Sequence, residues 1–166
     1  AEEGSDNHKL LDYVNGVGSA QVGIPFNGTI DGQGYALKNL KMHCSEKPQR
    51  NFNRGVSVIG YVGEQGTVRN ITLRNIYVTA GKYASFLVGY NKGTIENICV
   101  EADCSMQTSY SGGTLVAAYN DGKVTDVVSY VSTYIGFNGN EKDFVIANNR
   151  EIEEESGMNY VLHGTS

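Results

Sequence analysis

The chain has 166 residues, enough for one domain with a buried core, and 21 of them are glycine while only 2 are proline. Eighteen acidic against 13 basic residues leave a net charge of −5, which argues against a surface that binds nucleic-acid phosphates. No apolar run reaches the roughly 18 residues that a membrane-spanning helix needs. These figures favour a single domain over residues 1–166, without a membrane span and without a nucleic-acid partner.

In chain order, we expect three parts. Residues 1–23 are expected to form an irregular segment or N-terminal cap, residues 24–149 a series of coils, and residues 150–166 a partial coil with a C-terminal cap. Within the first coil, Asp31-Gly32-Gln33-Gly34 predicts a turn in which glycine supplies a positive φ.

The coils are indicated by an internal repeat. Residues 57–61, 86–90, 115–119 and 144–148 form one series of similar blocks, spaced by about 29 residues, and Asn91, Asn120 and Asn149 follow the last three at the same spacing. A second series occupies residues 66–71, 93–98 and 122–127. Residues 37–40 are aligned with residues 68–71 as an earlier copy. The regular spacing predicts that one structural unit recurs at this interval.

Each unit consists of short runs rich in Val, Ile, Thr and Tyr, bounded by Gly, Asn and Asp, which is typical of β-strands and turns. No run has the spacing of an amphipathic helix. A unit of about 29 residues cannot close its own core, whereas stacked units can. We therefore expect an all-β, right-handed parallel β-solenoid (β-helix-like), with about 29 residues per coil and roughly five coils between irregular capping ends.

Stacking predicts columns of equivalent side chains. The expected columns are aliphatic (Val58, Leu87, Val116, Val145), small (Gly60, Gly89, Ala118, Ala147) and amide-bearing at a corner (Asn39, Asn70, Asn97, Asp126). At the corner, side-chain amides would bond to their equivalents in the coils above and below.

Residues 87–97, Leu-Val-Gly-Tyr-Asn-Lys-Gly-Thr-Ile-Glu-Asn, resemble the GLUG motif of repeats in bacterial surface and secreted proteins. Residues 25–40 are similar to the segment that commonly precedes those repeats, while the copy at 115–127 departs from the motif at Ala118 and Asp126. The resemblance implies an exported β-solenoid, extracellular or at the cell surface, in a longer adhesin-like chain. Some relatives in that family are ancillary regions of immunoglobulin-A-cleaving peptidases. The family is defined by its scaffold, so no catalytic residue is carried over.

An enzymatic alternative starts from residues 28–34, which are similar to a segment of polygalacturonase-type β-helix hydrolases. Such hydrolases need paired acids at the glycosidic bond, and a lyase needs a Ca²⁺-binding acidic cluster. The chain has neither pattern, so we expect no enzyme activity and no cofactor. Cys44, Cys99 and Cys104 are odd in number and match no metal motif. We interpret the three cysteines as small buried hydrophobic residues. The alternative is that two of them form a single disulfide.

The candidate ligand-binding residues are Tyr61, Tyr90, Tyr119 and Phe86. They belong to strands that are apolar at nearly every position, so one strip of the sheet is expected to present apolar groups outward. Such a strip would either be packed by the termini or a neighbouring domain, or serve as a stacking platform for a glycan or protein ligand. Three functions follow: a non-catalytic surface module for adhesion or ligand binding, a spacer or accessory domain of a longer secreted chain, and a polysaccharide hydrolase or lyase.

Overall fold

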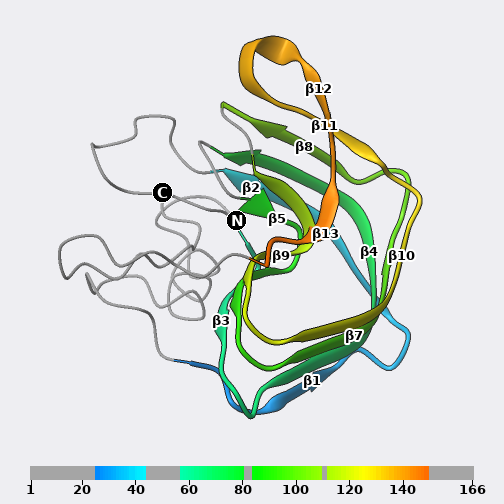
Figure 1. Cartoon of the computed structure of the whole chain (residues 1–166). Helices are drawn as coiled ribbons and strands as arrows, with labels where there is room; N and C mark the ends of the chain where they lie inside the picture. The colour runs from blue at the N-terminus through cyan, green and yellow to red at the C-terminus, as the bar shows by residue number, and fades with distance from the viewer. Residues whose placement is uncertain (1–24, 44–56, 81–83, 110–111, 150–166) are drawn as a thin grey trace, which may run out of the picture.

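The computed structural model of the chain describes residues 25–43, 57–80, 84–109 and 112–149 (Figure 1). The caps expected at 1–23 and 150–166 lie outside the described residues, as does Cys44. The described part is built from thirteen strands, β1 to β13, and one short 3-10 helix, η1 (Phe137–Gly139). An all-β chain was expected, and this part of the expectation is confirmed.

The strands form two sheets that curl around a shared interior (Figure 1). The first sheet contains, in order, β10 (Lys123–Ser129), β7 (Thr94–Val100), β4 (Thr67–Ala80), β8 (Ser105–Thr108), β11 (Thr133–Ile135) and β12 (Glu141–Asp143), with β1 (Thr29–Asp31) and β2 (Ala36–His43) also paired to β4. The second contains β13 (Val145–Ala147), β9 (Gly113–Asn120), β6 (Val88–Asn91) and β3 (Ile59–Val62), with β5 (Ala84–Ser85) paired to β9.

Strands in equivalent positions pair in parallel. In the second sheet Tyr61 pairs with Tyr90 and Tyr90 with Tyr119, so each step along the sheet equals the spacing of the sequence repeat. In the first sheet Thr94 pairs with Lys123 at that same spacing, and with Thr67 at a slightly shorter one. The predicted parallel pairing is therefore confirmed for these strands. Within the described residues, the antiparallel pair is β11 with β12.

The first copy pairs differently from its predicted alignment. Leu37 pairs with Leu73, and the neighbouring pairs place Asn39 beside Asn75, a separation of 36 residues along the chain. The alignment of residues 37–40 with residues 68–71 is therefore wrong. The reason is that β4 carries the same pattern twice, at residues 68–71 and 73–76, and the sequence alone does not show which copy faces β2.

The fourth copy is also displaced. Val145 pairs with Thr114 and Ala147 with Ala117, with a register shift between them. Val145 and Ala147 therefore do not continue the predicted columns of Val116 and Ala118. The repeat spacing returns immediately afterwards, because the Asn120 side chain donates to Asn149 Oδ1 over 2.8 Å.

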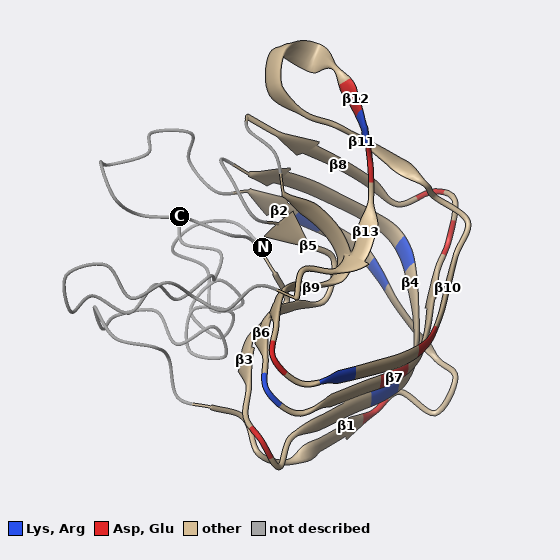
Figure 2. Cartoon of the chain, viewed as in Figure 1, with Lys and Arg blue, Asp and Glu red and all other residues tan. Residues whose placement is uncertain are grey.

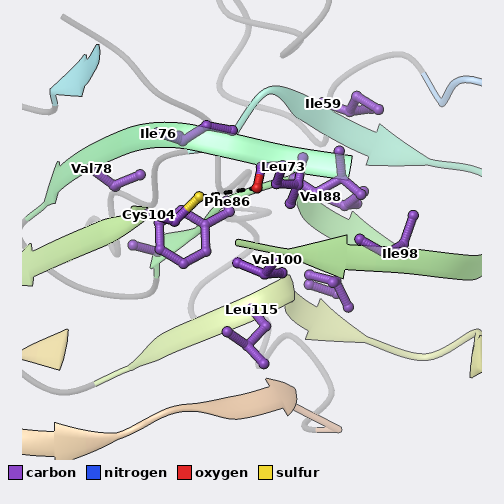
Figure 3. Close-up of a cluster of buried hydrophobic side chains, with 14 of the residues drawn as sticks. Ile59, Leu73, Ile76, Val78, Phe86, Val88, Ile98, Val100, Cys104 and Leu115 are labelled. Carbon is purple, nitrogen blue, oxygen red and sulfur yellow. Dashed lines mark hydrogen bonds between the residues drawn. The ribbon is translucent and has the colours of Figure 1, made fainter. Parts of the chain in front are cut away.

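The interior is filled by aliphatic and aromatic side chains from both sheets (Figure 3). On β4, Val68, Ile71, Leu73, Ile76 and Val78 are all buried. Burying each such side chain contributes about 1.5–3 kcal/mol.

Cys104 shares this core, and its Sγ donates to the backbone oxygen of Leu73 over 3.3 Å. Burial raises the pKa of the Cys104 thiol, so it stays protonated and behaves as a small hydrophobe, as expected. Cys99 is half-buried, and neither cysteine forms a disulfide in the described part.

Two asparagines let β4 keep its apolar residues inside. Asn70 and Asn75 have φ values of 56° and 48°, in the left-handed region. Each of these residues bends the strand and interrupts the alternation of faces, because a side chain in this conformation leaves the regular pleat. The strand is interrupted in this way at Asn70, a residue of the predicted corner column, and again at Asn75.

The predicted corner column is confirmed in part. Asn39, Asn70, Asn97 and Asp126 all have a positive φ, between 54° and 61°. Asn97 Nδ2 donates to Asn70 Oδ1 over 2.7 Å, and Asn70 Nδ2 donates to Asp31 Oδ1 over 2.9 Å. Asn39, however, accepts from Asn75 Nδ2 over 2.8 Å, in line with the corrected register.

Candidate ligand-binding surface

The tyrosines predicted as a column lie in one, on β3, β6 and β9. The rings of Tyr61 and Tyr90 are stacked, with centroids 5.0 Å apart and planes 16° from parallel. Tyr119 is in register with Tyr90 on the next strand. Tyr61 is half-buried, whereas Tyr90 and Tyr119 are only 7% and 6% exposed. The tyrosine column (Tyr61, Tyr90, Tyr119) thus offers solvent mainly the ring of Tyr61.

Charged groups flank this column. The Tyr90 hydroxyl donates to Asp121 Oδ2 over 2.9 Å, and Asp121 itself is exposed. Lys92 Nζ lies 5.8 Å from the centre of the Tyr90 ring, within the range of a cation–π contact. The column therefore combines an aromatic face with a carboxylate and an ammonium group.

Phe86 does not join the column. Its side chain is completely buried in the shared core (Figure 3). Its ring lies 5.5 Å from that of Phe144, which in turn lies 5.0 Å from the ring of Tyr134. Phe86 was grouped with the tyrosines because its strand is apolar at almost every position. In this structure it is a core residue and offers no exposed surface to a ligand.

A ladder of asparagines follows the tyrosines along the strands. Asn91 Nδ2 donates to Asn120 Oδ1 over 2.7 Å, and Asn120 Nδ2 donates to Asn149 Oδ1. Asn91 is fully buried, and its Oδ1 accepts the amide of Gly93 over 3.1 Å. The ladder fixes the position of the residue before it in each strand, which is Tyr90 or Tyr119.

The sequence carries a further signal for the ladder, beside the regular spacing of the three asparagines. Asn91-Lys-Gly93 and Asn120-Asp-Gly122 share an Asn-x-Gly pattern, and Asn149 follows Asn120 at the same spacing as Asn120 follows Asn91. Asn-x-Gly suits a turn in which the asparagine side chain bonds to the backbone two residues later. Asp121 and Lys92, at the middle positions of these turns, were not singled out.

Outside the column, charges of both signs are spread along the strands (Figure 2). Arg69 Nε donates to Asp31 Oδ2 over 2.9 Å, and its Nη1 lies 3.7 Å from Glu96. Hydrogen bonds from the Asn70 side chain and the Gln33 amide, together with Arg69, lower the pKa of Asp31. Arg69 is thus paired with carboxylates on two neighbouring strands.

No cluster of three or more His, Cys, Asp or Glu side chains suited to a metal ion occurs in residues 25–43, 57–80, 84–109 and 112–149. The same ranges contain no helix with the length and apolar character needed to cross a bilayer.

Comparison with known proteins gives two partial matches. The chain is 29% identical over 99 residues to a protein named halomucin from Haloquadratum walsbyi, a match covering 60% of this chain and 1% of that protein. It is 33% identical over 79 residues to a putative Gly-rich membrane protein from Evansella cellulosilytica, covering 46% of this chain and 8% of that protein. The matches thus span a small part of each relative. No family model and no solved structure matches the chain.

Proposed function

We propose that the chain is a non-catalytic repeat module that acts outside the cell or at the cell surface, binding a glycan or protein ligand through the tyrosine column. In this proposal the paired strands are successive coils of a right-handed β-solenoid with about 29 residues per coil, of the GLUG type. The names of the two relatives, a halomucin and a putative Gly-rich membrane protein, support a surface-associated role.

The observation that carries the proposal is the stacked pair Tyr61–Tyr90 beside exposed Asp121 and half-buried Lys92. Aromatic faces stack on the apolar faces of sugar rings or on aromatic and proline side chains, and they cost little conformational entropy to order. The carboxylate and ammonium groups add hydrogen bonds to hydroxyl groups. Within the column, Tyr61 is the tyrosine whose ring reaches solvent. We therefore assign Tyr61 the direct contact with the ligand, and Tyr90 the role of holding the Tyr61 ring in place.

A second candidate function is a spacer or accessory domain of a longer chain. The near-complete burial of Tyr90 and Tyr119 favours it, since side chains that serve only as a stack need no exposure. In both relatives the matching region is also a minor part of the protein. This candidate requires no ligand, which makes the two functions separable by experiment.

The test is binding of the purified chain to an array of glycans and mucins, with two matched tyrosine variants. Tyr61→Ala removes the half-exposed ring of the column. Tyr35→Ala removes a ring that is 76% exposed in the turn before β2, away from the column. Circular dichroism and thermal unfolding establish that both variants are folded.

The proposal predicts binding by the unmodified chain and by Tyr35→Ala, and a loss of at least about tenfold in affinity in Tyr61→Ala, the equivalent of one stacking contact. Equal binding by all three would place the site elsewhere. Absence of binding to every glycan and mucin would favour the spacer function.

A further inference from the structure

The turn between β11 and β12 contains an Asn-Gly pair that is exposed and has left-handed backbone angles. Asn138 has φ 58° and ψ 24°, and Gly139 has φ 74°. The Asn140 amide donates to the Phe137 oxygen over 3.2 Å and closes the turn. These left-handed angles show that η1 is not a regular 3-10 helix but holds a type I′ turn, for which Asn-Gly is the favoured pair. Figure 1 shows the turn at the end of a hairpin that projects from the sheets.

The surroundings of this pair are open. Asn138 and Gly139 are exposed, and a Cβ built on Gly139 would meet no atom within 4 Å. The Asn138 carboxamide makes no hydrogen bond to the described part of the chain. Among the described residues, the Gly139 amide donates to the Gly136 oxygen over 3.2 Å, a long hydrogen bond. Both reacting groups of a deamidation are therefore accessible in the folded protein.

We propose that Asn138 is a site of spontaneous deamidation that converts this hairpin to a charged, loosened form. The Gly139 backbone nitrogen attacks Asn138 Cγ, a new N–Cγ bond forms, and ammonia leaves with the proton that the nitrogen gives up. Water then opens the cyclic imide at either carbonyl and yields aspartate or isoaspartate. No oxidation or reduction takes place, and water is the single co-reactant.

A second Asn-Gly pair serves as an internal comparison. Asn27 Oδ1 accepts the Gln65 amide over 3.3 Å and lies directly against the Cα of Gly63, where a Cβ would overlap it. The Asn27 carboxamide must leave this contact before Gly28 can attack. Local opening adds to the reaction barrier, so the structure distinguishes two pairs that are identical in sequence.

The consequence lies at the last strands of the sheets. β12 pairs with β11 through Thr133 with Asp143 and Ile135 with Glu141, and Thr133 Oγ1 donates to Glu141. The Asn-Gly turn lies within the five-residue loop between the paired residues Ile135 and Glu141. Isoaspartate places one extra methylene in the backbone of this turn, and we expect the added length to disturb the register of the pair. The charged strand β12 covers the outer edge of β11, so its loosening exposes backbone groups of an edge strand.

The experiment incubates the folded full chain at mildly alkaline pH and follows it by proteolysis and mass spectrometry. An isoaspartyl methyltransferase assay identifies isoaspartate, and hydrogen exchange reports on β12. The matched variant is Asn138→Gly, because Gly-Gly also fits a type I′ turn but has no carboxamide. A sample in denaturant provides the intrinsic rate of each pair.

We expect the folded chain to gain the mass of an NH₂-to-OH replacement at Asn138 at least about tenfold faster than at Asn27, with faster exchange in β12 as the product accumulates. Asn138→Gly should show neither change in the hairpin. Equal rates at the two pairs, or no reaction at Asn138 while the denatured chain reacts there, would overturn the proposal.

Discussion

Three glycines allow the backbones of successive turns to approach one another closely. Gly66, Gly93 and Gly122 each lie against the backbone of the preceding repeat, and a Cβ on Gly93 or Gly122 would overlap the carbonyl oxygen of the glycine before it in the series. Those same oxygens accept the amides of Thr94 and Lys123. Glycine is therefore required by close backbone approach, which explains its place in the Asn-x-Gly pattern.

Gly93→Ala is expected to lower the free energy of unfolding by about 1–3 kcal/mol, because the backbone must shift to admit the methyl group. Gly34→Ala is the control, since Gly34 has nothing within 4 Å of its Cβ position. Because Gly34 has a φ of 81°, alanine at this position should still lower the free energy of unfolding by about 1 kcal/mol. Urea denaturation of both variants measures the difference, and a smaller loss in Gly93→Ala than in Gly34→Ala would refute the close-approach argument.

Asn91→Ala tests the buried asparagine ladder. The change leaves the Gly93 amide and Asn120 Oδ1 without their partner inside the protein, which should cost about 1–3 kcal/mol. The exposed ladder at Asn97 gives a matched comparison through Asn97→Gly, which keeps the positive φ. Equilibrium unfolding should show a smaller loss in the free energy of unfolding for Asn97→Gly than for Asn91→Ala. The reverse order would contradict the idea that the buried ladder stabilises the fold more than the exposed one.

Asp31 predicts a pH dependence of stability. Its pKa is lowered from 3.8 by hydrogen bonds from Asn70 and Gln33 and by Arg69, so the folded state binds its proton less readily than the unfolded chain. The stabilisation is complete above the unfolded pKa and is lost as pH falls below 3.8 toward the lower folded pKa.

The measurement compares the unmodified chain with Asp31→Asn in unfolding experiments from neutral to acidic pH. The stability gap between them should be constant at neutral pH and narrow below about pH 4, because the unmodified chain then loses its carboxylate. If the stability difference stays unchanged at the lowest pH measured, the charge of Asp31 does not contribute to the stability of the folded state.

At the scale of strands, much of the register could be predicted because the repeats carry their own alignment. The steps Tyr61–Tyr90–Tyr119 and Thr94–Lys123 follow the spacing of the sequence repeat. The register of β2 could not be predicted, because β4 holds two similar runs with left-handed asparagines, Asn70 and Asn75. A single sequence does not show which of the two lies beside Asn39.

The burial of the candidate residues was harder to predict than their spacing. Strands that are apolar at nearly every position do not reveal which face is solvent-exposed, since both faces of β6 and β9 are buried. The tyrosine spacing was therefore predicted correctly, while Phe86 was assigned to the wrong environment. Its partner Phe144 belongs to the repeat block at residues 144–148, and the repeat alone gives no sign of this ring contact.

Phe144→Ala tests how the last strands attach to the sheets. The ring lies between Phe86 and Tyr134 and is half-buried, so its removal should cost about 2 kcal/mol of burial and aromatic contact. Tyr130→Ala is the control, because Tyr130 is 66% exposed and should change stability by less than about 0.5 kcal/mol. Similar losses of stability in the two variants would argue that this aromatic cluster does not hold the last strands to the sheets.

At the scale of the whole molecule, one feature connects the fold with the proposed function. Parallel pairing of equivalent strands places the same side-chain type at each step, so a single residue choice becomes a tyrosine column or an asparagine ladder. Neutral amides and aromatic rings occupy these columns, while charges pair across strands, as for Arg69 with Asp31 and Glu96. Such a surface favours recognition by stacking and hydrogen bonding over recognition by net charge.

The fold and the tyrosine column both depend on parallel pairing of equivalent strands, which inter-strand nuclear Overhauser contacts can detect. We predict backbone contacts of Thr94 with both Thr67 and Lys123, and ring contacts between Tyr61 and Tyr90. The natural alternative is a hairpin, since β6 and β7 follow each other with only Lys92 and Gly93 between them. Contacts that pair β6 with β7 in antiparallel register would contradict the parallel pairing and, with it, the tyrosine column.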